Sequence, residues 1–461
     1  MKKSKTEKKN STELDIHEPR VKTFFQLLGN TLFVSVIDYT VWFAITFYTF
    51  LQTNSVAATA IIAGIFLVMT ALTGIWFGSL VDHHKKKTMM LLSTAASFVL
   101  YLICFAIYQT TPHDVFKDPS SVMLWVFVTL LMVGVIAGNI RNIAMPTLVT
   151  ILIPEDRRDK ANGLVGTISG VGFLVTSVIS GVLVAINGMF YVLLLAAAIQ
   201  ILAIIHLWFI KVPEKGVVHV EGAPAPSKKV DLKGTFKLVR GVPGLMALIL
   251  FTTFNNFLGG VFMALMDAYG LSLVPVQVWG FLWGLLSTGF IIGGLIIAKT
   301  GLGKNPVRAM LLANVVLWII SSLFTIQASI ILLAVGMYIY MLLMPYIEAS
   351  EQTILQRVVP YERQGRVFGF AQSVEQSASP LTAFVIGPIA QFIFIPFMTT
   401  GAGVDLIGDW FGTGMNRGLA LVFTLTGIIG LVITLIALSS KYYRQLSKQY
   451  LQSHVNQKIA E

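Results

Sequence analysis

The sequence predicts an all-α membrane protein whose chain crosses a bilayer twelve times. Of its 461 residues, 55% are hydrophobic and only 12% are charged, whereas a soluble domain usually carries about 25% charged residues. The apolar residues come in long blocks, and a helix needs roughly 20 of them to cross the hydrocarbon core. The blocks lack the alternation that marks barrel strands. Helices are therefore the expected spanning elements, because they satisfy their own backbone hydrogen bonds.

Twelve apolar blocks follow one another along the chain, and polar or basic turns separate them. Asp82–Lys87, Thr111–Asp114 and Gly301–Pro306 are examples of these breaks. The expected spans are 24–51, 55–81, 89–109, 121–152, 164–186, 188–210, 244–270, 276–298, 308–327, 329–356, 367–397 and 415–439.

The placement of positive charge predicts the orientation. With the N-terminus in the cytoplasm, all but three of the 33 lysines and arginines fall in cytoplasmic loops or tails, as the positive-inside rule requires. The exceptions are Lys117 and Arg417 on the outer side and Arg141 inside the fourth block. Topology thus explains the net charge of +11 without nucleic acid. We expect a multi-pass protein of the plasma membrane with both termini cytoplasmic.

Two small features bound the class further. The first block is too long for the core of a signal peptide, so we expect no cleaved signal. The single cysteine, Cys104, lies inside an apolar block and offers neither an intrachain disulfide nor a metal cluster.

An internal repeat divides the chain into two halves. At a constant offset of 206 residues, Ile153–Gly163 matches Val359–Gly369, and the register continues to Gly181 and Gly387. Parallel repeats of this kind build the two halves of some transporters. We predict a cytoplasmic tail at 1–23, a six-helix half at 24–210, a cytoplasmic linker at 211–243 with a short surface helix near 232–240, a six-helix half at 244–439 and a cytoplasmic tail at 440–461.

The loop between the second and third blocks, from Gly78 to Lys87, reads GSLVDHHKKK. Gly-x-x-x-Asp followed by a basic run at this place resembles the signature loop of the major facilitator superfamily. Together with twelve blocks and the repeat, the resemblance covers nearly the whole chain. The segment from Pro146 to Gly181 is similar to the macrolide-efflux-like branch of the drug–proton antiporters. The resemblance implies the major facilitator fold, with two halves that rock about a central cavity.

The same resemblance implies a gating loop formed by Gly78, Asp82, Lys86 and Lys87. Asp82 would tie the loop to a partner helix, and the tie would break as the halves rock. Gly78 would let the second helix approach a neighbour closely. The alternative is that the basic run is a topology signal only.

Ionisable residues inside a membrane are costly and usually functional. The candidates are Asp38, Arg141, Asp267, Glu348, Glu351, Glu375 and His206. The superfamily resemblance implies that helices 1, 4, 7 and 10 line the cavity, and these carry Asp38, Arg141, Asp267 and Glu348. Of the aromatic candidates for stacking on a ligand, we favour Trp42, because it shares a helix face with Asp38.

Asp38 is the predicted proton-coupling and substrate-sensing carboxylate. At 1.5 Å per residue it lies about 21 Å from the inner end of its block, near mid-membrane, and apolar surroundings favour the neutral form of a carboxyl group. Arg141 would hold Asp38 or a water network in one state. The alternative is a structural Asp38–Arg141 pair without a transport role.

The other acids have open alternatives of their own. Asp267 could be a rim residue that reaches outer water, and Glu375 could be a second titrating site. We expect Glu351 to be partnered by Arg357 or solvated at the inner end, and His206 to be a packed helix residue.

The sequence predicts a proton-coupled multidrug exporter of amphipathic or cationic small molecules that works by alternating access. Candidate cavity acids outnumber the one base, which favours cationic or neutral ligands. The rivals are an exporter or flippase of a lipid-like or siderophore-like metabolite, and a non-transporting receptor or enzyme. No zinc-protease, nucleophile-elbow, Walker or haem motif is present. We expect a monomer whose partners are a small-molecule substrate, protons and the lipid bilayer, with no cofactor, metal or nucleic acid.

Overall fold

The computed structural model describes residues 14–53, 56–214 and 232–460, and over these residues the secondary structure is helical, without strands. Twelve helices in this part of the chain are long and apolar enough to cross a membrane. The predicted all-α, twelve-helix fold class is thereby confirmed.

The elements follow one another in two series. In the first half the spanning helices are α1 (Pro19–Thr53), α2 (Val56–His83), α3 (Lys86–Thr110), the consecutive pair α4 (Val122–Gly138) and α5 (Ile140–Leu152), α6 (Arg158–Asn187) and α7 (Phe190–Phe209). In the second half they are α9 (Leu245–Leu273), α10 (Val276–Thr300), α11 (Pro306–Leu323), α12 (Ile330–Val358), α13 (Gln364–Ile389) continued by a π-helical turn η4 (Ala390–Phe394) and α14 (Ile395–Thr399), and α16 (Met415–Ser439). The remaining elements are η1 (His113–Lys117), η2 (Glu155–Arg157), α8 (Leu232–Gly241), η3 (Tyr361–Arg363), α15 (Ala402–Phe411) and α17 (Lys441–Ala460).

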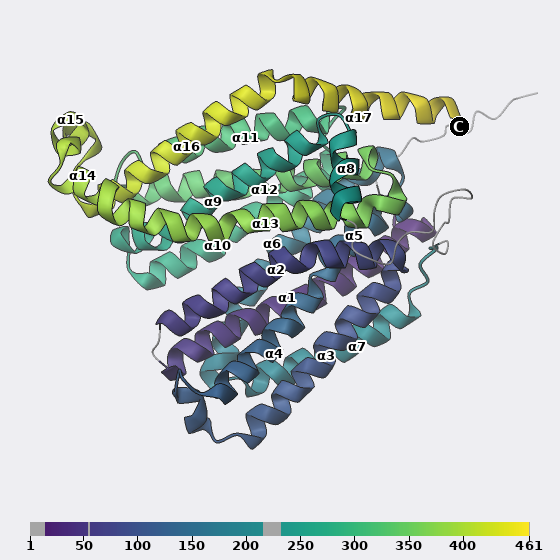
Figure 1. Cartoon of the computed structure of the whole chain (residues 1–461), viewed down its shortest axis with the longest axis horizontal. Helices are drawn as coiled ribbons and strands as arrows, with labels where there is room; N and C mark the ends of the chain where they lie inside the picture. The colour runs from purple at the N-terminus through teal and green to yellow at the C-terminus, as the bar shows by residue number, and fades with distance from the viewer. Residues whose placement is uncertain (1–13, 54–55, 215–231, 461) are drawn as a thin grey trace, which may run out of the picture.

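The two series form two bundles that lie side by side (Figure 1). Helix α2 packs along α13, and α6 packs along α10 and α12, so these helices join the halves. Each bundle has an aromatic interior: Phe116 packs against Phe127 in the first at a tilted angle, and Phe262 lies parallel to Phe423 in the second, with centroids 5.2 Å apart.

Three α-helices of the described residues lie outside the twelve spanning segments: α8, α15 and α17. The surface helix expected near 232–240 is α8, whereas residues 215–231 of the linker and residues 1–13 of the first tail lie outside the described residues. The sequence reading missed α15 and α17. Helix α15 has only ten residues, too few to span a bilayer, and α17 is rich in charged and polar residues, so neither stands out as an apolar block.

Arg417 links the end of α15 to the loop after α11 through hydrogen bonds to backbone carbonyls. Its Nε donates to the carbonyl of Phe411 at 2.5 Å, and its terminal nitrogens donate to the carbonyls of Thr325 and Ile326 at 3.0 and 2.8 Å. The guanidinium also lies over the Phe411 ring, 4.1 Å from its centroid. One buried cation thus supplies donors to carbonyls from two separate loops.

Replacing Arg417 by Gln should lower the melting temperature of the purified protein. A buried carbonyl left without a donor costs about 1–3 kcal/mol, and Gln cannot reach all three. A thermal unfolding scan in detergent measures the effect, and Arg308→Gln, at an exposed position, is the control. Equal melting temperatures for Arg417→Gln and the native protein would contradict this role.

Candidate functional site

The halves make close backbone contact at one end, where α2 finishes and α6 begins. We refer to it as the basic end, because the loops rich in Lys and Arg lie there. A Cβ added to Gly78 would overlap the carbonyl of Gly365, and one added to Gly163 would meet Ile297 of α10 at 2.7 Å. Only glycine permits such close approach of two helices.

The glycines of the same helices make no close contacts at the opposite end, which we call the open end. Gly181 on α6 and Gly387 on α13 lie about five turns beyond Gly163 and Gly369, on the same helix faces. A Cβ at Gly181 or Gly387 would meet no atom within 4 Å, whereas a Cβ at Gly369 would overlap the carbonyl of Gly74. The closest glycine contacts between the two halves therefore lie toward the basic end.

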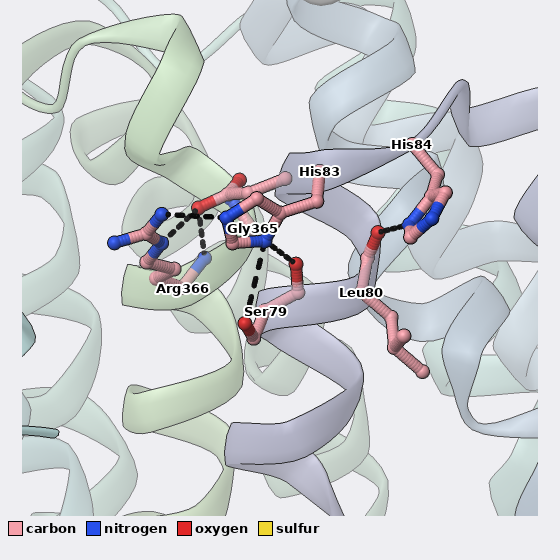
Figure 2. A network of polar contacts seen from close by, with 7 residues as sticks. Ser79, Leu80, His83, His84, Gly365 and Arg366 are labelled. Carbon is pink, nitrogen blue, oxygen red and sulfur yellow. Dashed lines mark hydrogen bonds and ion pairs between the residues drawn. The ribbon is translucent and has the colours of Figure 1, made fainter. Parts of the chain in front are cut away.

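Asp82 joins α2 to the first turn of α13. Its carboxylate accepts hydrogen bonds from the backbone N–H of Gly365 at 2.6 Å and of Arg366 at 2.9 Å, and it lies 3.4 Å from Arg366 Nε. Figure 2 shows Gly365 and Arg366 facing His83 and Ser79 on α2; His83 Nε2 is 3.2 Å from Arg366. A helix N-terminus favours a negative charge through its free N–H groups, so this contact stabilises closure of the basic end.

The two lysines of the loop differ in their partners. The Glu214 carboxylate accepts from the backbone N–H of Lys86 and Lys87, at 2.6 and 2.9 Å. Lys86 Nζ lies over the ring of Tyr361 in the other half, 4.8 Å from its centroid. Lys87 Nζ instead donates to the carbonyl of Ile210, at 2.6 Å within its own half.

Asp38 is buried in the first half and is held by two neutral donors. Tyr101 on α3 and Gln200 on α7 each donate to its Oδ1 at 2.8 Å. Gly138 leaves the space that the carboxylate fills, since a Cβ there would overlap Oδ2. Neither donor, Tyr101 nor Gln200, was predicted from the sequence. Gln200 could have been noticed as the only side-chain amide in the sixth block; Tyr101 had no such signal.

Arg141 lies near Asp38 but bonds elsewhere. Its terminal nitrogens donate to Asn30 Oδ1 at 2.9 Å and to Thr94 Oγ1 at 2.6 Å, while its buried Nε has no partner. The described residues contain no Asp38–Arg141 ion pair within 4 Å, although the two charges interact over a longer range. The ring of His206, expected to pack, lies 3.2 Å from Asn30 Nδ2.

A second group of acids lies in the other half. Thr252 Oγ1 on α9 lies 2.9 Å from a carboxyl oxygen of Glu375 and 3.2 Å from one of Glu351, and the two carboxyl groups form a hydrogen bond with each other. A hydrogen bond between carboxyl groups requires that one of them carries a proton. The expectation of an Arg357 or solvated partner for Glu351 is wrong. Arg357 is six residues further on and points to another helix face.

Glu348 of the second half lies within electrostatic range of Tyr39 of the first half. The Tyr39 hydroxyl lies within electrostatic range of both Asp38 and Glu348, and Tyr340 of α12 also interacts with Glu348. Both Glu348 and Tyr39 are exposed, although they lie on helices at the centre of the molecule. Polar groups from both halves therefore lie close to one another near the centre of the molecule.

Asp267 and Trp42 lie away from this centre. Asp267 is near the open end, where Trp279 and Trp283 donate their indole N–H to it at 2.9 and 3.2 Å. Trp42 packs against Phe66 of α2, with centroids 5.2 Å apart, and its buried Nε1 has no hydrogen-bond partner. The shared helix face thus does not bring Trp42 into contact with the Asp38 carboxylate.

Comparison with known proteins agrees with the fold. Residues 27–383 match the family described as Major Facilitator Superfamily. Macrolide efflux protein A of Streptococcus pyogenes is 22% identical over 352 residues, which are 73% of this chain and 82% of the relative. A bacterial homologue of the iron transporter ferroportin, solved in an outward-facing state, superposes with a TM-score of 0.66 at 16% identity, covering 91% of this chain and 100% of that one. A proton:xylose symporter superposes with a TM-score of 0.59 at 13% identity, covering 90% and 96%.

Proposed function

Because the chain belongs to the major facilitator superfamily, and is thus a transporter rather than an enzyme, we propose that it exports amphipathic or cationic small molecules, macrolides among them, in exchange for protons. The observation that carries this proposal is Asp38, a buried carboxyl group of a membrane-spanning helix that is held by two neutral donors from α3 and α7. The efflux function of the named relatives supports the direction.

Asp38 is placed to exchange a proton for a substrate. Tyr101 and Gln200 can donate to the carboxylate, and both can also hold the neutral acid in the same position. A protonated Asp38 would no longer attract a cation, so loading a proton would release the substrate. Each charge that crosses 100 mV supplies about 2.3 kcal/mol, which can drive export against a gradient.

In this proposal, alternating access gives the substrate and the proton a path across the membrane. We take both termini to be cytoplasmic, so that the basic end faces inward, and the glycine contacts at that end support a state open to the outside. In the counterpart state the Asp82 contact and the glycine contacts of the basic end would separate, and the far end would close. The Asp38 carboxyl would then face each side of the membrane in turn.

The residues around the opening suit positively charged or neutral aromatic ligands. Asp38 and Glu348 contribute negative charge, and Tyr39 and Tyr340 offer ring faces that attract cations. Arg141 is engaged by Asn30 and Thr94, so the local balance favours cations over anions. The Asp267 carboxylate, with its two indoles at the open end, would be a last contact before release.

The test uses purified protein in liposomes. Ethidium and radiolabelled erythromycin are loaded, and efflux is followed with and without an imposed pH gradient. We expect efflux of at least one probe that depends on the gradient. If neither probe moves in either condition, the proposal is wrong, and movement of a labelled lipid alone would assign the chain to lipid translocation instead.

A further inference from the structure

The internal repeat relates the two junctions between the halves at the basic end. Asp159 stands 206 residues before Gly365, and Gly365 donates to Asp82 at the α2–α13 junction. At the α6–α10 junction the roles are reversed. There the α6 segment supplies the carboxylate, and the loop after α10 supplies the backbone N–H.

Asp159 holds the loop that follows α10. Its Oδ2 accepts a hydrogen bond from the backbone N–H of Leu302 at 2.7 Å. The preceding residue, Gly301, has φ of +73°, and a Cβ there would meet the Asp159 carboxylate at 2.5 Å. The loop therefore needs a glycine to reach Asp159. Leu302 is buried, so the N–H that it presents has little access to water.

Glu155, one turn earlier, makes an ion pair across the same junction. Its carboxylate pairs with Arg357 at the end of α12, and the two side chains are 18% and 9% exposed. Such partial burial protects an ion pair from screening better than a position on the open surface. Glu155 and Asp159 thus bind two different elements of the second half.

The terminal helix α17 reaches the same ion pair. The Arg357 guanidinium lies over the ring of Tyr450, 4.2 Å from its centroid, and the two side chains also form a hydrogen bond. Helix α17 is seated on the second half by buried Leu446 and by Asn305 Nδ2, which donates to Ser447 Oγ at 2.6 Å. Tyr450 is itself buried, so α17 orients Arg357 toward the first half.

We propose that Glu155 and Asp159 form a second gate at the basic end, complementary to the Asp82 junction, and that α17 braces this gate through Tyr450. This inference rests on the proposed function, in which the basic end alternates between a closed and a separated state. It adds a residue set that controls the population of those states, and it makes the C-terminal helix a regulator of transport.

Spin-label distances at the basic end test the proposal without any substrate. Labels are placed at two exposed positions, Lys211 just after α7 and Lys304 just after α10, in a Cys104→Ser background. A charge-assisted hydrogen bond stabilises the closed basic end, so losing one should change the ratio of separated to closed molecules about tenfold. We expect Asp159→Ala and Glu155→Gln each to raise the separated population by about that factor.

Four further variants make the result specific. Asp82→Asn should also raise the separated population, as the reference for the first gate. Asp156→Asn, which removes the same charge at an exposed position in the same segment, should leave the distances native. Tyr450→Ala should act in the same direction as Glu155→Gln, and Tyr450→Phe, which keeps the ring over Arg357, should have a smaller effect.

The outcomes separate the gate from the proposed function. Native distances in Asp159→Ala and Glu155→Gln, beside a shift in Asp82→Asn, would overturn the second gate alone. Native distances in all of these variants would overturn alternation itself, and the gate with it. A shift in Asp159→Ala but not in Tyr450→Ala would refute the brace. Asp159→Asn, of the same size as the native residue, replaces Asp159→Ala if that variant does not elute as a single folded species.

Discussion

Asparagine at position 38 should abolish gradient-driven efflux and leave the protein folded. The amide oxygen of Asn can still accept from Tyr101 and Gln200, which now donate to the carboxylate at 2.8 Å. An amide, however, takes up no proton in the physiological range, so the imposed gradient has no group to act on at this site. We expect accumulation against the gradient to fall to the level of empty liposomes, while downhill exchange of the probe persists.

Efflux of ethidium and erythromycin from liposomes, with and without the pH gradient, measures this effect. Asp405→Asn, which changes an exposed carboxylate on α15, serves as the matched control and should retain native coupling. Gradient-driven efflux at the native rate in Asp38→Asn would remove Asp38 from the coupling mechanism. The two neighbouring acids of the second half, Glu351 and Glu375, would then be the next candidates.

The substitution Gly369→Val should keep the two halves separated at the basic end. A Cβ on Gly369 would overlap the carbonyl of Gly74 and would lie 2.8 Å from the Cα of Gly78. These neighbours are backbone atoms and cannot rotate away, so the helices must separate. Overpacking of this kind typically costs about 1–3 kcal/mol, which corresponds to roughly a tenfold to hundredfold shift between two states. We expect Gly369→Val to lose transport and to show the separated distance between labels at the basic end.

Gly387→Val is the matched control on the same helix and the same face. A Cβ at Gly387 meets nothing within 4 Å in this structure, so the state closed at the basic end should tolerate the larger side chain. Identical label distances in the two variants would show that the glycine contacts do not set the closed state.

Much of the architecture follows from local sequence properties. Apolar blocks of spanning length predict the twelve helices one by one, since each helix satisfies its own backbone in lipid. The exceptions are informative. Helix α15 was not predicted because it is too short to span a bilayer, and α17 because it is polar. Helices α4 and α5 were predicted as one block because the break at Asn139 changes the hydrogen bonding but not the hydropathy.

The candidate site was predicted by residue type and not by partner. Burial of an acid in an apolar block is visible in the sequence, and this is why Asp38, Glu351 and Glu375 could be named. Their partners come from other helices: Tyr101 and Gln200 from α3 and α7, and Thr252 from α9. The spacing along one helix says nothing about these contacts.

The sequence alone thus determined the class, the number of spanning helices and the repeat, because hydropathy, charge placement and periodicity are local properties of a chain in a bilayer. The tertiary structure decided that Arg141 bonds to Asn30 and Thr94, that Arg357 pairs with Glu155 and Tyr450, and that one end of the molecule is closed. The physical reason is that hydrogen bonds, ion pairs and glycine contacts act over a few ångströms between residues 40 to 300 positions apart in the chain. Only the packing of the helices brings such residues together.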